Sequence, residues 1–357
     1  MQETNWKFYL NSEDAWEAML ADCAAAKVSI DFEQFIFVND AIGKRFFNIF
    51  ISKIKEGVKV RLLCDSAGSY GLYNSSFANE LKKQGIEIRF FNPISPWRLK
   101  NFTSWFFRDH KKILIVDSEI GYTGGVGIDK KLEGWRDAQV RVVGPVVLEM
   151  TQAFEKMWEI VDFGRFIKFK NNRIKEGDFH FHTNSPHFRQ RFFYRRLNDA
   201  IRQAKEYVYL TTPYFVPSQH FFLILRRAVK RGVDVRIIIP EKSDHPLVDA
   251  AGRSYFGLAL KWGIKIYRLK NGMLHTKIAI IDDKWASVGS ANLDNLSLLF
   301  NYEANLISEN KLFVGELKNH FVNDLLAAED LVGEEWRNRS NWQKFVELLT
   351  WPFHTIL

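Results

Sequence analysis

The feature that most constrains this chain is a long internal repeat. The phrase "DHKKILIVDSEIGYTGGVGID", from Asp109, and the phrase "LHTKIAIIDDKWASVGSANLD", from Leu274, share the spacing His-x-Lys-x4-Asp at one constant offset. Upstream, "AKVSIDFEQFIF" resembles "AKEYVYLTTPYF", and "EGVKVRLLCD" resembles "RGVDVRIIIP", in the same order in both halves. Two copies are too few for a repeat array, so the repeat predicts two homologous lobes.

Each half alternates strand-like and helix-like patterns. The stretch "KVSIDFEQFIF" is typical of a strand, "IGKRFFNIFISKIKEG" has apolar residues at helical spacing, and "VKVRLLCD" is typical of a buried strand. This order predicts α/β lobes, each a mostly parallel β-sheet flanked by helices. We expect a first lobe over 1–163, a polar and basic linker over 164–178, a second lobe over 179–335 and a C-terminal amphipathic tail over 336–357.

Composition narrows the classes of partner. The chain has 357 residues and a formal net charge of +8, which favours nucleic acid or an acidic lipid surface without choosing between them. Only two cysteines, Cys23 and Cys64, are present, so a disulfide framework is excluded and no metal site is expected. No apolar run reaches the roughly 18 residues of a membrane-spanning helix, and the N-terminal residues do not resemble a signal peptide.

The repeated motif supplies the candidate catalytic residues. They are His110, Lys112, Asp117, His275, Lys277 and Asp282. Residues two apart on a strand share a face, so the histidine and lysine of each copy point into one pocket. The aspartate lies an odd number of positions away, and we expect it to brace the backbone or turn beyond the strand. A single histidine on a strand is more often structural, but two matching motifs at one offset favour a shared catalytic site.

Small and polar residues after each motif complete the predicted site. The supporting residues are Gly125, Ser290, Asn292, Asp137 and Glu303. Glycine allows a close backbone approach, and the serine and asparagine can donate hydrogen bonds to an oxyanion. The two carboxylates occupy matching places, where each can fix the tautomer of an imidazole. Two His-Lys pairs facing each other would bind a phosphate. One histidine would attack phosphorus and the other would serve as acid and then base.

These motifs resemble those of the phospholipase D superfamily, in which the His-x-Lys-x4-Asp phrase is duplicated. Within it, "TTPYFVPSQ", "KRGVDVRIIIP" and "NYEANL" are similar to phrases of bacterial cardiolipin synthases. The resemblance implies lobes related by a pseudo-twofold axis, one active site at their interface, no cofactor or metal, and a phosphohistidine on His110 with His275 as acid and base. Two departures are Gly127, where the family often has asparagine, and the lack of the N-terminal transmembrane helices that some members carry. The second departure favours a peripheral protein on the cytoplasmic face of the bacterial inner membrane.

The first half contains extra residues within "NPISPWRLKNFTSWFFRD" that the second half lacks. The expected membrane-binding residues there are Trp97, Arg98, Lys100, Phe102, Trp105, Phe106, Phe107 and Arg108. Aromatic and basic residues together are typical of an interfacial anchor, although a loop packed on the neighbouring lobe is the alternative. The tail "NWQKFVELLTWPFHTIL" allows the same two interpretations.

The sequence is compatible with three functions. The first is a phosphatidyltransferase that makes cardiolipin from two phosphatidylglycerol molecules, with release of glycerol. The second is a phosphodiesterase that hydrolyses phospholipid or, less favoured, nucleic acid, since aromatic and basic residues also bind single strands. The third, a catalytically silent lipid-binding protein, is disfavoured because both His-Lys pairs are intact. The expected partner is therefore an anionic phospholipid at a membrane surface, and no nucleic acid is expected.

Overall fold

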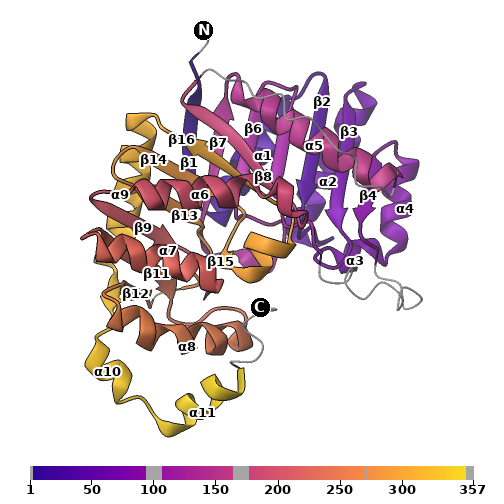
Figure 1. Cartoon of the computed structure of the whole chain (residues 1–357). Coiled ribbons are helices and arrows are strands. Elements are labelled where there is room, and N and C mark those ends of the chain that lie inside the picture. Colours follow the sequence, from indigo (N-terminus) through magenta and orange to yellow (C-terminus); the bar gives the residue numbers. More distant parts are fainter. Residues whose placement is uncertain (1–2, 94–106, 164–176, 271, 351–357) are drawn as a thin grey trace.

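A computed structural model describes residues 3–93, 107–163, 177–270 and 272–350, and its chain folds into two lobes, each built on one large β-sheet (Figure 1). The first sheet has the strand order β1-β7-β6-β5-β2-β3-β4. Its strands are β1 (Asn5–Asn11), β2 (Ser29–Gln34), β3 (Lys59–Asp65), β4 (Glu87–Phe91), β5 (Ile113–Val116), β6 (Ile120–Gly124) and β7 (Arg136–Val143). The helices of this lobe are α1 (Ser12–Ala25), α2 (Ala41–Lys55), α3 (Tyr70–Tyr73), α4 (Ser76–Lys83) and α5 (Val146–Phe163).

The second sheet has the strand order β17-β12-β11-β9-β13-β14-β16-β8. Its strands are β8 (Phe179–Asn184), β9 (Tyr207–Thr211), β11 (Asp234–Pro240), β12 (Lys265–Leu269), β13 (Ile278–Ile281), β14 (Trp285–Gly289), β16 (Glu303–Ser308) and β17 (Ala328–Asp330). A separate small pair joins β10 (Phe215–Val216) and β15 (Leu293–Asp294). The helices are α6 (Phe192–Gln203), α7 (Gln219–Lys230), α8 (Pro246–Lys261), α9 (Lys311–Leu326), α10 (Gly333–Arg337) and α11 (Asn341–Thr350).

Sequence patterns account for the helices. In α2, the Asp40 side chain accepts hydrogen bonds from the backbone N–H groups of Ile42 and Gly43, which closes the first turn. Phe46 and Phe50 then recur at helical spacing and are fully buried against the first sheet. The amphipathic spacing therefore determines which face of the helix packs inward.

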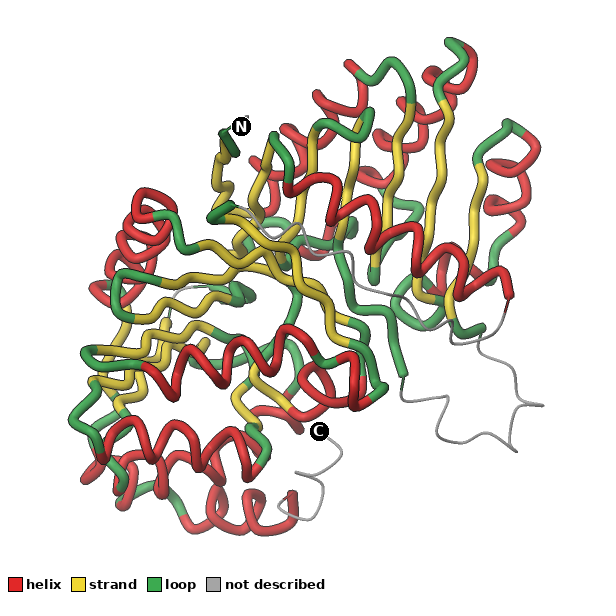
Figure 2. Tube along the Cα trace, turned by 45° about the horizontal axis from the view of Figure 1, so that its top comes forward, coloured by secondary structure: helices red, strands yellow, loops and turns green. Residues whose placement is uncertain are grey.

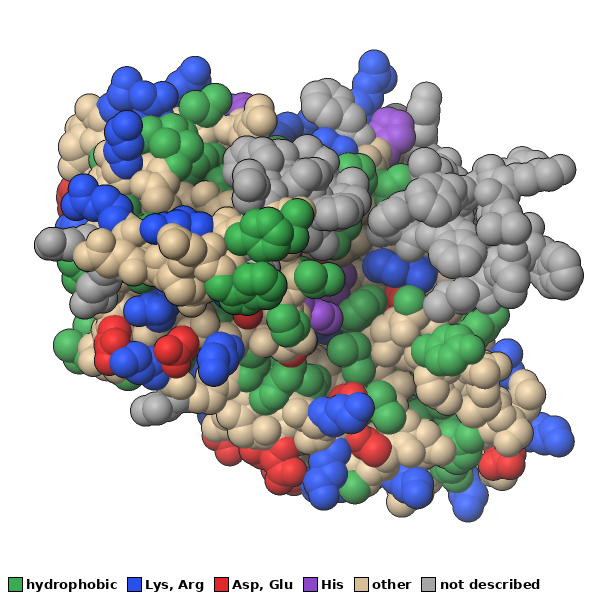
Figure 3. All heavy atoms as spheres, turned by 90° about the horizontal axis from the view of Figure 1, so that it is seen from below, with side chains coloured by type: hydrophobic (Ala, Val, Ile, Leu, Met, Phe, Trp, Pro, Cys, Tyr) green, Lys and Arg blue, Asp and Glu red, His purple; other side chains and the backbone are tan. Residues whose placement is uncertain are grey.

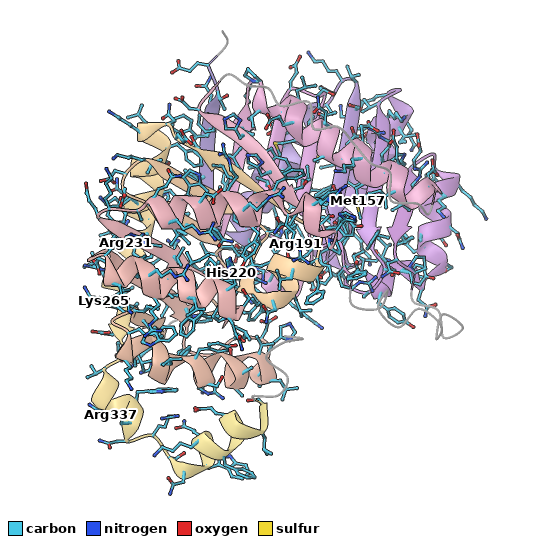
Figure 4. All side chains as sticks on the ribbon, in the orientation of Figure 1. Met157, Arg191, His220, Arg231, Lys265 and Arg337 are labelled. Atoms are coloured by element: carbon cyan, nitrogen blue, oxygen red, sulfur yellow. The ribbon has the colours of Figure 1, made fainter. Side chains whose placement is uncertain are left out.

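The apolar core consists of one cluster shared by both lobes and one further cluster in each lobe. One apolar cluster joins α5, α9 and inward-facing residues of both sheets, and Met157 on α5 lies in it near the middle of the molecule (Figure 4). Helices α6, α7 and α8 belong to a cluster of the second lobe, and α1, α2 and α4 to a cluster of the first. Figure 2 shows the strands as two groups with helices between and around them.

The prediction of two duplicated α/β lobes is confirmed, but the expectation of mostly parallel sheets is wrong. Only β2-β3-β4 and β9-β11-β12 are parallel, and the other neighbours in both sheets are antiparallel. The reason is local, since β5 and β6, like β13 and β14, are joined by tight turns that connect only antiparallel strands. The sheets are therefore mixed.

The proposed lobe boundaries remain a prediction, and residues 164–176 of the linker lie outside the described residues. The described part of the C-terminal tail forms the end of α10 and the whole of α11. Within the described ranges, no helix has the length and apolar character needed to cross a bilayer.

A candidate active site shared by the two lobes

The two motif histidines lie where the lobes meet. Each precedes an inner strand, β5 or β13, and each is fixed by a short backbone bridge to the other lobe. The His110 N–H donates to the Tyr302 carbonyl (2.9 Å), and the His275 N–H donates to the Arg136 carbonyl (2.8 Å). The structure thereby brings the two copies of the motif to one interface.

A carboxylate from the opposite lobe holds each imidazole. Nδ1 of His110 lies 3.0 Å from Oε1 of Glu303 and 3.1 Å from its Oε2. Nδ1 of His275 lies 2.7 Å from Oδ2 of Asp137. Both carboxylates are buried. A neutral imidazole that donates from Nδ1 keeps a lone pair on Nε2, so each ring has a defined tautomer with one nitrogen left for chemistry.

The two motif lysines are buried, and no carboxylate of the described residues is bonded to either of them. Lys112 and Lys277 are each only 2% exposed, and each Nζ donates to the carbonyl oxygen of the histidine two residues before it. Burial, opposed by Glu303 and reinforced by Lys277, lowers the pKa of Lys112 to about 7. Burial likewise lowers the pKa of Lys277 to about 8. An anion placed between these lysines would relieve their repulsion.

Both histidines are held neutral in the ligand-free protein. Burial, opposed by Glu303, lowers the pKa of His110 below its ordinary value. Burial and the neighbouring Lys277 lower the pKa of His275, against the effect of Asp137. A neutral imidazole is the form that can attack phosphorus. A bound anion would raise the pKa of both rings, so protonation of one histidine is linked to ligand binding.

The motif aspartates lie at the far ends of the same strands. Asp117 accepts hydrogen bonds from the backbone N–H groups of residues 27–29, and Asp282 accepts them from residues 205–207, all within 3.1 Å. The backbone at both aspartates has positive φ. They tie the turn after the motif strand to the start of β2 or β9, which is the backbone-bracing role that strand geometry predicts. The structure does not bring either of them to the histidines.

Gly125 and Ser290 help to position the carboxylates of Asp137 and Glu303. A Cβ at Gly125 would lie 2.2 Å from a carboxylate oxygen of Asp137, so glycine leaves room for that side chain. Ser290 donates its hydroxyl to Glu303 (2.5 Å) and accepts from the Ala304 N–H (3.0 Å). Ser290 thus helps to hold Glu303, and its donation to a bound oxyanion stays a prediction.

Asn292 is buried beside another carboxyl group. Its Oδ1 has no hydrogen-bond partner among the described residues, and its amide interacts with Asp294. Burial raises the pKa of Asp294 to about 7. Asn292 therefore remains the supporting side chain with an unused polar atom.

Sequence reasoning missed the aromatic neighbours of the histidines. The Phe35 ring lies edge-on to the His110 ring, with centroids 4.8 Å apart, and the Trp135 ring lies edge-on to His275 at 5.3 Å. Phe35 directly follows β2, and Trp135 lies two residues before Asp137. The phrase "GWRD" was the available signal. These rings help to exclude water from the imidazoles.

The two half-sites are not equivalent. Behind His110, the buried Lys111 forms an ion pair with Glu33 and lies 3.6 Å from a carboxylate oxygen of Asp109. Burial and the neighbouring Asp109 raise the pKa of Glu33. The sheet register places Thr211 of the second lobe where Glu33 lies in the first. The charged cluster therefore has an uncharged counterpart, which gives the two histidines different surroundings.

The predicted membrane insert is only partly described. Six of its expected residues, Trp97, Arg98, Lys100, Phe102, Trp105 and Phe106, lie outside the described residues. Phe107 is half-buried. Arg108 pairs with the fully buried Asp65 at 3.2 Å and donates to the Asn92 carbonyl at 2.8 Å. Its assignment to the membrane surface is therefore corrected, because the guanidinium neutralises an internal carboxylate.

The cysteines are free and buried, and burial raises the pKa of both the Cys23 and Cys64 thiols. In the part of the chain that the structure describes, no group of three or more His, Cys, Asp or Glu side chains is arranged to hold a metal ion.

The chain is similar to known proteins over most of its length. A family model described as "Cardiolipin synthase, PLD-like domain" matches residues 19–158 and 197–325, one stretch in each lobe. Cardiolipin synthase 1 of Bacillus anthracis is 32% identical, covering 96% of this chain and 71% of its own length. The cardiolipin synthase of Listeria monocytogenes serovar 1/2a is 31% identical, covering 98% of this chain and 74% of its own length.

Solved structures share the fold at low sequence identity. Phosphatidylserine synthase of Haemophilus influenzae Rd KW20 matches with a TM-score of 0.73 at 13% identity, over 99% of this chain and 95% of its own. Polyphosphate kinase of Porphyromonas gingivalis matches with a TM-score of 0.63 at 12% identity, over 93% of this chain and 49% of its own. At such identities the likeness establishes the two-lobed architecture alone.

Proposed function

Because the chain belongs to the cardiolipin synthase family of phospholipase D-like proteins, we propose that it joins two phosphatidylglycerol molecules into cardiolipin and releases glycerol. The observation that carries this proposal is the crossed arrangement of the site. Each histidine is oriented by a carboxylate of the other lobe, with a buried lysine beside each. Two imidazoles and two cations around one point suit the exchange of one phosphodiester for another.

The reaction proceeds in two displacements at phosphorus. Nε2 of His110 attacks the phosphorus of the first phosphatidylglycerol, and the bond from phosphorus to the glycerol oxygen breaks. Protonated His275 gives its proton to that oxygen, so glycerol leaves neutral. Neutral His275 then takes the proton from a hydroxyl of the second lipid, whose oxygen attacks phosphorus and breaks the bond to His110. Each displacement inverts the configuration, so the net result is retention.

The lysines stabilise the charge that builds up on the non-bridging oxygens. Lys112 and Lys277 are already desolvated, so their attraction for the phosphoryl oxygens requires little reorganisation during the reaction. The negative charge of the substrate also offsets their effect on His275, whose protonation then accompanies substrate binding. Removing one such cation is expected to slow turnover by about 10²–10³-fold.

A membrane surface explains why a lipid hydroxyl competes with water. Helix α11 exposes Trp342 (70%), Phe345 (49%) and Leu349 (56%) on its outer side. It lies at the lower end of the molecule in Figure 1, and Figure 3, which views that end, shows hydrophobic and histidine side chains on one face. Apolar side chains on a basic protein favour docking on anionic bilayers. We place the protein peripherally, on the cytoplasmic face of the bacterial membrane, where acceptor lipid is concentrated.

The alternative function is hydrolysis of the same phosphodiester, since water at His275 would complete the same two steps and yield phosphatidic acid. Mass spectrometry of products from phosphatidylglycerol vesicles separates the two. The proposal predicts cardiolipin and free glycerol, with phosphatidic acid minor, and added glycerol should regenerate phosphatidylglycerol because the exchange is nearly thermoneutral. Phosphatidic acid as the main product at every lipid density would replace the transferase with the hydrolase. Single-stranded DNA in place of vesicles tests the nuclease activity.

A further inference from the structure

A pocket of the second lobe, outside both motifs, contains buried donors without partners. It lies between the loop after β9, the end of β11, helix α8 and helix α10, and Arg253, Arg268 and Trp336 are among its lining residues. Nε of Arg253, Nε of Arg268 and Nε1 of Trp336 are each buried and have no hydrogen-bond partner in the part of the chain that the structure describes. Trp336 is 8% exposed as a whole residue. We call this the Arg253 pocket.

Among the described residues, neither the Arg253 nor the Arg268 guanidinium forms an ion pair or a side-chain hydrogen bond. Glu241 and Asp249 also line the pocket, yet neither pairs with an arginine, and Asp249 accepts from the Ser243 N–H at 2.9 Å. Both arginines are half-buried, and arginines in such sites ordinarily bind carboxylates or phosphates through their planar fork of N–H groups. Three unpaired donors that line one pocket therefore favour the binding of an anionic ligand.

The pocket opens at the same edge of the second sheet as the active site. Strand β13 is antiparallel to β9, and Ile278, three residues after His275, pairs with Thr211 at the carboxyl end of β9. The Arg253 pocket follows the carboxyl ends of β9 and β11. None of the motif residues lines it. The pocket is thus a neighbour of the catalytic site and separate from it.

The wall of the pocket is linked to the helix that exposes apolar side chains. The Trp336 ring packs on Phe256 with centroids 5.2 Å apart. The Arg339 guanidinium lies 4.5 Å from the Trp336 ring centroid and bonds Glu347 of α11 at 2.7 Å. A ligand held by Trp336 would therefore lie close to the helix that we place on the bilayer.

We propose that the Arg253 pocket is a second phosphate-binding site, which takes the phosphodiester headgroup of an anionic phospholipid. The arginines and the indole N–H would bind the phosphate oxygens, and Glu241 and Asp249 would accept hydrogen bonds from headgroup hydroxyls. The same carboxylates repel a second negative charge, so a glycerol phosphodiester fits better than inorganic phosphate. Only the choice of a lipid as the source of the phosphate rests on the proposed function.

Fluorine NMR of protein labelled with 5-fluorotryptophan tests the site directly, with Trp336→Phe identifying the resonance. Inorganic phosphate, glycerophosphoglycerol, phosphatidylglycerol vesicles and phosphatidylcholine vesicles serve as separate probes. We expect the Trp336 signal to shift with glycerophosphoglycerol and with phosphatidylglycerol vesicles, at concentrations about tenfold below those required for phosphate. The Arg253→Gln, Arg268→Gln double variant should abolish the shift without lowering Tm, because neither guanidinium has a hydrogen-bond or ion-pair partner among the described residues.

The matched control removes two charges from an exposed part of α7, in an Arg227→Gln, Lys230→Gln double variant. It should keep the Trp336 shift. With phosphatidylglycerol vesicles, the Arg253 and Arg268 double variant should raise KM by about tenfold, whereas turnover of bis(4-nitrophenyl) phosphate, a short soluble phosphodiester, should not change.

The outcomes separate the possibilities. A shift with phosphate but not with phosphatidylglycerol vesicles or glycerophosphoglycerol would overturn the lipid assignment. No shift with any probe, or equal loss in the α7 control, would overturn the site itself. If the proposed function is wrong but the pocket is real, the wild-type protein will make no cardiolipin, and its Trp336 signal will still shift with glycerophosphoglycerol.

Discussion

Replacing a catalytic lysine with methionine should stabilise the ligand-free protein while slowing turnover by about 10²–10³-fold. Lys112 is buried, and within the described ranges its ammonium group bonds the His110 carbonyl and no carboxylate. Folding therefore removes a cation from water and returns one hydrogen bond. Methionine has a similar length, no charge and a flexible thioether that fills irregular space. Lys112→Met should therefore raise the free energy of unfolding, because it removes an unfavourable buried charge that the reaction requires.

The magnitude follows from the shifted pKa. Burial lowers the pKa of Lys112 from 10.5 to about 7. Each unit corresponds to about 1.4 kcal/mol, so at pH 7, where the native lysine is half protonated, the shift costs the native state about 4 kcal/mol. Loss of the hydrogen bond offsets about 1 kcal/mol of this, which leaves an expected gain of about 3 kcal/mol. The corresponding gain for Lys277→Met is smaller, because the pKa of Lys277 is lowered only to about 8. The two gains are not additive, because Lys277 contributes to the shift of Lys112.

The gain should depend on pH with a defined sign. The pKa of Lys112 is lower in the native state than in the unfolded state, so the unfolded chain binds more protons between about pH 7 and 10.5. Wild-type stability therefore rises with pH in that window, and the advantage of Lys112→Met shrinks. It should fall from about 3 kcal/mol at pH 7 to about 1 kcal/mol at pH 9.

Urea unfolding of wild type, Lys112→Met and the exposed control Lys131→Met at pH 7 and pH 9 measures this difference. The control should match the wild type within about 0.5 kcal/mol at both pH values. A Lys112→Met protein less stable than wild type at pH 7, or a gain that is equal at the two pH values, would refute the reasoning.

Three further predictions test other parts of the site. Asp137→Asn and Glu303→Gln should each lower turnover by about 10²–10⁴-fold with Tm nearly unchanged, and a wild-type rate in a steady-state assay would exclude the crossed pairing. Asp282→Ala should lower the free energy of unfolding by about 2–4 kcal/mol, because three backbone N–H groups lose their acceptor; an unchanged urea midpoint would contradict its bracing role. Trp342→Ser with Phe345→Ser should abolish co-sedimentation with anionic vesicles without altering Tm, since both side chains are exposed, and retained binding would argue against docking through α11.

Much of the site was predictable because the repeat and the strand period are local features of the sequence. The constant offset between His110 and His275 predicts two lobes and two half-sites. The two-residue spacing of histidine and lysine predicts a shared face. The odd spacing of Asp117 predicts a separate place at the strand end, where the structure has it.

The rest depends on how distant segments pack. Which carboxylate serves which histidine is determined by the docking of the lobes, and no spacing along the chain encodes it. Arg108 has the composition of a surface cation, yet it neutralises Asp65, which only the tertiary fold brings near. The unpaired donors of Arg253 and Arg268 likewise become visible only when α8 and β12 line one pocket.

Peptide mass spectrometry after a denaturing quench within the first turnover on phosphatidylglycerol vesicles tests whether the crossed pair of histidines acts at one phosphorus. We predict a phosphatidyl group on the peptide that contains His110, absent from the His110→Gln protein. An adduct on His275 instead would exchange the two roles within the same site. Cardiolipin formation at the wild-type rate with no adduct on either histidine would contradict the account.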